Sequence, residues 1–178
     1  ALIHQDFTVS GSSPLVEFFR SRIEVTNPGT PLVDINCFID NPPKSRNEAL
    51  SSLMRRLKMC EELGSGWDRI ALECELNRLP APKIMLYEEN TKVILFAKLA
   101  FANIPHEEKL WSCYLHACIK YLTHEGLTNS SLRLRFGLED TASAQISRLI
   151  KDAVSKDFIK PFDAETSQRY MKYIPSWA

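Results

Sequence analysis

The apolar positions of the first hundred residues alternate with polar ones in two places, and each place predicts a β-hairpin. The expected strand pairs are 15–19 with 22–26 and 83–87 with 91–96. Between the hairpins, apolar residues recur at helical spacing, which predicts one helix capped by Asn47 and another from about Trp67. We therefore expect an α+β domain with at least four strands and two helices.

The pattern of the second part predicts three helices followed by two strands. The expected helices are 107–124, 129–136 after a cap at Thr128 or Asn129, and a third one capped by Asp140 or Thr141. The expected strands are 158–162 and 169–174. Three helices and a hairpin, with a tight turn between the second and third helices, are typical of a winged helix-turn-helix. We expect two domains, 1–102 and 103–178.

Composition narrows the class of protein. The chain has 178 residues, of which 44% are hydrophobic and 25% charged, as in ordinary globular proteins. No apolar run approaches the ~20 residues of a membrane helix, and no signal peptide is visible. We expect a cytoplasmic protein without a membrane partner. The start at Ala1, without Met and within an apolar pattern, suggests a piece of a longer protein.

The chemistry-bearing residues exclude several classes of site. Five Cys without a CxxC motif predict free thiols in a reducing compartment, and the His spacing predicts no metal site. No GxxxxGK[ST] motif is present, so the chain holds no P-loop. We assign no catalytic residue.

The third predicted helix of the second part carries the candidate DNA contacts. The side chains opposite its apolar face are Thr141, Ala144, Arg148, Lys151 and Ser155, with Gln145 at the flank. Gln can read adenine, and Arg can read guanine or hold a phosphate. The expected phosphate contacts from the second helix and the wing are Arg133, Arg135, Lys160 and Arg169.

Two observations keep other functions open. The net charge is 0, and Asp152 and Asp157 near the third helix would repel phosphate. Winged helices also dock proteins, so a protein-interaction or homodimerisation module is an alternative to binding of double-stranded DNA.

The first part contains two candidate anion sites. Gly64, Ser65 and Gly66 precede a helix and could hold a phosphate, or they could form a helix C-cap and turn. The basic loop 44–47 could hold an anion at the start of its helix, or it could cap that helix.

Several linked motifs resemble one family. They are ALIHQDF (1–7), RIEVTNPG (22–29), SRN (45–47), EELGSGWDRI (61–70) and LPAP (79–82). In this order they resemble the C-terminal region of transcriptional regulators that are often labelled RecG-type ATP-dependent DNA helicases. That region is similar to a degenerate ATPase domain of the histidine-kinase/gyrase/Hsp90 type, an α/β sandwich. The resemblance covers about residues 1–97, and a winged helix follows.

The resemblance implies a nucleotide site for ATP and Mg²⁺. Its adenine-binding motif falls at Asn27 and Gly29, where the Asp and the second Gly of the motif are missing, and its glycine-rich lid falls at 64–66. The catalytic Glu and Asn of such ATPases would lie before Ala1, and another domain is expected upstream. We therefore expect no hydrolysis by this chain, and weak nucleotide binding stays open. A DNA-binding transcriptional regulator is the leading prediction.

Overall fold

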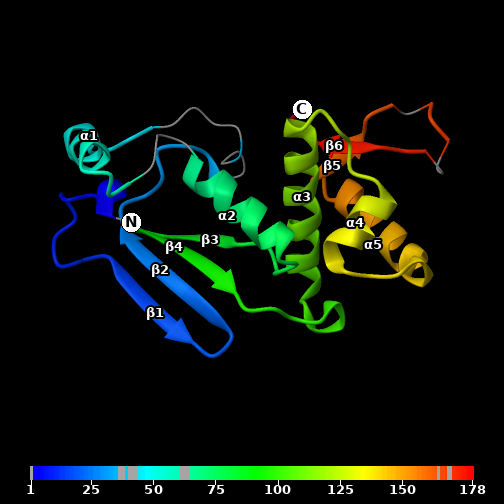
Figure 1. Ribbon diagram of the computed structural model, residues 1–178, viewed down its shortest axis with the longest axis horizontal. Coiled ribbons are helices and arrows are strands. Elements are labelled where there is room, and N and C mark those ends of the chain that lie inside the picture. The colour runs from blue at the N-terminus through cyan, green and yellow to red at the C-terminus, as the bar shows by residue number, and fades with distance from the viewer. Residues whose placement is uncertain (1, 36–38, 40–43, 61–64, 164, 168–169) are drawn as a thin grey trace. The chain divides into compact units, whose positions relative to one another are not determined.

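The computed structural model describes residues 2–35, 39, 44–60, 65–163, 165–167 and 170–178. The chain forms two compact units, the first from residues 1–71 and 82–97 and the second from 72–81 and 98–178. Antiparallel strands and helices occur together, which confirms the expected α+β class (Figure 1). Among the described residues, no helix is both long enough and apolar enough to cross a bilayer.

The first unit is built on a four-stranded antiparallel sheet with the order β1-β2-β4-β3. Its strands are β1 (Leu15–Phe19), β2 (Arg22–Pro28), β3 (Lys83–Tyr87) and β4 (Asn90–Phe96). Both predicted hairpins are therefore confirmed, and β2 and β4 pair with each other in the middle of the sheet (Figure 1).

A charged cluster joins the two central strands. Glu24 of β2 is buried, and it accepts hydrogen bonds from Lys92 Nζ of β4 at 2.6 Å and from Arg22 Nε at 2.5 Å. Hydrogen bonds from both cations hold the pKa of Glu24 below its ordinary value. By contrast, the edge strand β1 leaves Leu15, Val16, Phe18 and Phe19 exposed.

The helices of the first unit start near the predicted places. They are α1 (Glu48–Arg56) and α2 (Ser65–Leu76), whose last turn belongs to the second unit. The 3₁₀ helix η1 (Leu2–His4) was not predicted. Asn47 occupies the predicted N-cap position of α1, but its side chain makes no hydrogen bond to the start of the helix. Its amide instead donates to the carbonyl oxygens of Ile3 at 3.1 Å and Gln5 at 2.7 Å.

The second unit contains the expected helices and the strand pair, together with the 3₁₀ helices η3 (Phe101–Asn103) and η4 (Asp140–Ala142), which were not predicted. The expected elements are α3 (His106–Leu122), α4 (Asn129–Phe136), α5 (Ser143–Ser155), β5 (Ile159–Pro161) and β6 (Tyr173–Pro175). β5 and β6 form an antiparallel pair (Figure 1). Leu127 adds a bridge to Tyr173. α5 starts later than predicted, because Asp140 lies in η4 and pairs with Arg133 instead of capping α5.

Apolar side chains of all three helices form the core of the second unit. Leu110 of α3, Leu132 of α4 and Ile146 of α5 are completely buried. Burial raises the pKa of the Cys113 thiol in α3 to about 12, which makes it an inert core residue. Near the C-terminus, Trp177 Nε1 donates to the Tyr114 hydroxyl at 2.9 Å.

Local signals place both ends of α4. Thr128 and Ser131 form a reciprocal capping box at its start. Gly137 ends the helix with a φ of 66°, in the left-handed region that glycine adopts without strain. Both ends of α4 therefore have the chemistry that the sequence predicts.

Candidate functional site

One face of α5, with the preceding turn, is exposed to solvent. It contains the candidate side chains Thr141, Ala144, Gln145, Arg148, Lys151 and Ser155. The opposite face of the helix is buried through Ile146, Leu149, Ile150 and Ala153. The structure thus brings these predicted residues together on one surface.

Of the two candidate residues on the wing, Lys160 and Arg169, the structure describes Lys160. Lys160 lies in β5 and is half-buried. Just after β5, the N–H of Phe162 donates to Lys172 O of the returning segment at 2.9 Å. Arg169 lies outside the described residues. The returning strand is shorter than predicted, because Tyr170 belongs to a turn in which its N–H donates to Ser167 O at 3.0 Å.

Asp152, one of the two acidic residues near this surface, has a partner of its own, while Asp157 is exposed. Asp152 Oδ2 lies 3.6 Å from His106 Nε2 at the start of α3. Lys156 Nζ lies 2.6 Å from Glu107 Oε1 of the same helix. Charges on this flank of α5 therefore face α3, and the positive charges of Arg148 and Lys151 stand on the exposed face.

The phosphate contact expected from Arg135 of α4 is wrong. The one expected from Arg133 would compete with contacts that its guanidinium already makes inside the protein. Arg135 is 6% exposed, and its Nη2 donates to Leu79 O at 2.6 Å. Its Nε lies 3.7 Å from Glu75 Oε2. Arg133 forms an ion pair with Asp140, and its Nε donates to Asn129 Oδ1 at 2.9 Å. Both guanidinium groups are thus engaged within the protein.

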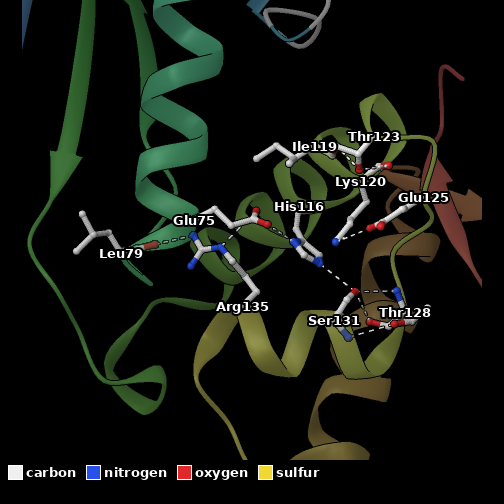
Figure 2. A network of polar contacts seen from close by, with 10 residues as sticks. All are labelled: Glu75, Leu79, His116, Ile119, Lys120, Thr123, Glu125, Thr128, Ser131 and Arg135. Atoms are coloured by element: carbon white, nitrogen blue, oxygen red, sulfur yellow. Dashed lines mark hydrogen bonds and ion pairs between the residues drawn. The ribbon is translucent and has the colours of Figure 1, made fainter.

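Arg135 belongs to a buried polar network that the sequence did not reveal (Figure 2). Glu75 of α2 contacts His116 of α3, with 2.7 Å between Oε1 and Nδ1. His116 Nε2 lies 3.0 Å from the hydroxyl of Ser131 in α4. The Arg135 guanidinium loses water on burial, which lowers its pKa, while Glu75 opposes that shift. The Glu75 carboxylate is therefore the acidic partner of two buried side chains, His116 in α3 and Arg135 in α4.

The order of carboxylate, imidazole and hydroxyl resembles that of a hydrolase triad. The hydroxyl of Ser131, however, already donates to Thr128 O and accepts from Thr128 N–H, each at 3.0 Å (Figure 2). A hydroxyl committed to a helix cap in this way is not a free nucleophile. The network holds the start of α4 against α2 and α3.

The nucleotide candidates lie in the first unit. Gly29 has a φ of 99°, and Arg46 covers it: a Cβ on Gly29 would overlap with Arg46 Nη1 and would lie 2.7 Å from Asp6 Cβ. Arg46 Nη2 donates to Thr30 O at 2.7 Å, and its Nη1 lies 3.5 Å from Asp6 Oδ2. The guanidinium thus lies against the backbone where the resemblance places the adenine.

Other atoms around this loop lack partners. Asn27 Oδ1 and Ser45 Oγ are buried without a hydrogen-bond partner in the part of the chain that the structure describes. Gly64 lies outside the described residues, while Ser65 and Gly66 form the first turn of α2. The described residues contain no group of three His, Cys, Asp or Glu side chains that could hold a metal ion.

Comparisons with known proteins give one family. Residues 11–95 match the family model described as "Putative ATP-dependent DNA helicase recG C-terminal". No curated protein matches the chain. Among solved structures it is similar to the DIP2311 protein from Corynebacterium diphtheriae, with 12% identity and a TM-score of 0.48. That match covers 98% of this chain and 48% of the other, so the chain spans about half its length. Residues 11–95 are therefore similar to the ATPase-like domains of the RecG C-terminal family.

Proposed function

We propose that residues 103–178 form a winged helix that binds double-stranded DNA, and that the protein is a transcriptional regulator. The observation that carries this proposal is the exposed face of α5, which presents Gln145, Arg148 and Lys151 behind the Gly137 turn. α5 would be the recognition helix in the major groove, and the β5–β6 pair would be the wing.

The residue types on the exposed face of α5 suit contact with the major groove of DNA. Ala144 is small, which lets the helix backbone approach the bases closely. The Gln145 amide can bind adenine through two hydrogen bonds, and the Arg148 guanidinium can do the same with guanine. Lys151 and Lys160 would contact phosphates. Because Asp152 faces His106, its charge stands at the flank rather than beside the proposed phosphate contacts.

Arg148→Ala is expected to weaken DNA binding by about 1–3 kcal/mol, because it removes a base or phosphate contact. The measurement is fluorescence anisotropy with a labelled mixed-sequence duplex, from low to physiological salt. For the unmodified protein, log affinity should fall with log salt on a slope of several units. Lys151→Ala should reduce that slope by about 1.

Arg56→Ala is the matched control, since Arg56 is an exposed arginine on α1 of the other unit. Equal affinities of the Arg148 and Arg56 variants would count against the assignment of α5. No binding by the folded protein at low salt would reject DNA as the ligand. The same winged helix would then serve protein contacts, with a homodimer as the first case to examine by light scattering.

We also propose that the ATPase-like domain binds nucleotide weakly without hydrolysing it. The family match of residues 11–95 supports a nucleotide-derived fold. The buried, unpartnered Asn27 Oδ1 offers an acceptor at the position where the resemblance places the adenine site. The Arg46 guanidinium over Gly29 would compete with a base for the same backbone, which is the reason to expect weak binding.

Calorimetry with ATP and Mg²⁺ is expected to show binding only at millimolar nucleotide, without release of phosphate. Asn27→Ala should abolish the heat by removing the acceptor. Asn103→Ala is the control, because Asn103 is an exposed asparagine outside the matched segment. Absence of heat from the unmodified protein at millimolar ATP would reject nucleotide binding by this chain.

A further inference from the structure

The side-chain amide of Asn129 joins the start of α4 to the first turns of α5. Its Nδ2 donates to Ser143 O and to Ser147 Oγ, each at 2.9 Å. Its Oδ1 accepts from Ser143 Oγ at 3.3 Å and from Arg133 Nε at 2.9 Å. A primary amide has two N–H donors and two acceptor lone pairs, so all of its hydrogen-bonding capacity is used here.

The Asn129 amide supplies directional contacts between α4 and α5, which the apolar side chains do not. Ile146, Leu149 and Ile150 hold α5 on the core, but dispersion contacts are non-directional and allow a helix to rotate or slide slightly. Hydrogen bonds to Ser143 and Ser147 fix two points one helical turn apart on α5. They therefore set both the axial position and the rotation of its N-terminal half.

Arg133 extends the same constraint to the turn before α5. Its guanidinium pairs with Asp140 in η4 while its Nε donates to Asn129. α5 has no side-chain cap at its own start, where Ala142 occupies the capping position. Asn129 and Arg133 are thus the polar contacts from α4 that hold the beginning of α5.

We propose that Asn129 is a positioning residue for DNA recognition, and this proposal rests on the proposed function of α5. Ser143 and Ser147 bracket Ala144 and Gln145, and Arg148 directly follows Ser147. By fixing the two serines, Asn129 fixes the direction in which Gln145 and Arg148 meet the groove. Base recognition depends on such placement more strongly than phosphate attraction does, because bidentate hydrogen bonds tolerate little misorientation.

The test compares Asn129→Ala with Ser130→Ala, a variant of the neighbouring exposed residue on α4. Two probes are used: a mixed-sequence duplex, and the duplex that the unmodified protein selects from a random pool. Asn129→Ala should lower affinity for the selected duplex by about twofold to tenfold, the equivalent of one hydrogen bond. Affinity for the mixed-sequence duplex and its salt slope should stay unchanged, whereas a loss of folded protein would lower both affinities together.

Hydrogen exchange without DNA gives an independent readout. In the Asn129 variant, the backbone amides of the first turns of α5 should exchange faster than in the Ser130 variant. Equal exchange in the two variants would overturn the proposal, as would faster exchange with unchanged affinity for the selected duplex. If the unmodified protein binds no DNA, the proposed function fails, while the exchange measurement still decides whether Asn129 holds α5.

Discussion

Glu75→Ala is expected to lower the free energy of unfolding of the second unit by about 3–5 kcal/mol, the usual cost of breaking a buried ion pair. The substitution leaves the Arg135 guanidinium buried with Leu79 O as its remaining acceptor, and it leaves His116 Nδ1 without its carboxylate. The measurement is urea unfolding followed by the fluorescence of Trp111 and Trp177, which both lie in the second unit.

Two further variants distinguish the effect of the unpaired buried charge from a general weakening of α2. Glu73→Ala removes an exposed carboxylate from the same helix and should change stability by less than about 0.5 kcal/mol. Glu75→Met combined with Arg135→Met should recover much of the loss, because apolar residues of similar size often replace a buried ion pair without cost. If Glu75→Ala unfolds like Glu73→Ala, the network does not stabilise this unit.

Gly29→Ala is expected to destabilise the first unit by two separate effects. A non-glycine residue at φ 99° carries strain of about 1–3 kcal/mol. Crowding by the new methyl group against Arg46 and Asp6 adds about 1–3 kcal/mol. The Arg46 side chain can swing away, but the Cβ of Asp6 is fixed by its backbone, so part of the crowding should persist in Gly29→Ala combined with Arg46→Ala.

Gly11 offers a matched control for the strain alone. Its φ is 73°, and a Cβ built there meets no atom within 4 Å. Thermal unfolding followed by circular dichroism should therefore show a smaller loss for Gly11→Ala than for Gly29→Ala. Equal losses would mean that the close approach of Arg46 and Asp6 adds nothing to the requirement for glycine at position 29.

The sequence predicted those elements whose ends are set by neighbouring residues. The start of α4 at Thr128 and its end at Gly137 follow from capping chemistry that acts within three or four residues. The start of α5 did not follow, since Asp140 pairs with Arg133 on another helix. Likewise, Asn47 stands where a cap is expected, but its amide binds Ile3 and Gln5 from a distant segment.

The exposure of the candidate DNA contacts was likewise predicted correctly where neighbouring residues decide it, and wrongly where distant residues decide it. Helical projection placed Gln145 and Arg148 on an exposed face, because α5 has one clear apolar side. It could not show that Arg135 is buried, since α4 is short and its polar residues surround it. That burial is decided by Glu75 and Leu79, which lie more than fifty residues earlier in the chain. Similarly, the resemblance singled out Gly29, but only the structure shows Arg46 over it.

The origin of Glu75 and Leu79 bears on how this protein can change in evolution. The second unit takes residues 72–81 from the middle of the chain, between segments of the first unit. A recombination event at residue 98 would move the three helices and the hairpin without the carboxylate that their buried arginine requires. Residues 98–178 therefore depend on residues 72–81 and cannot be exchanged between proteins by themselves without loss. A lineage that acquired residues 98–178 by a single crossover would have to replace Arg135 or supply a new counter-charge.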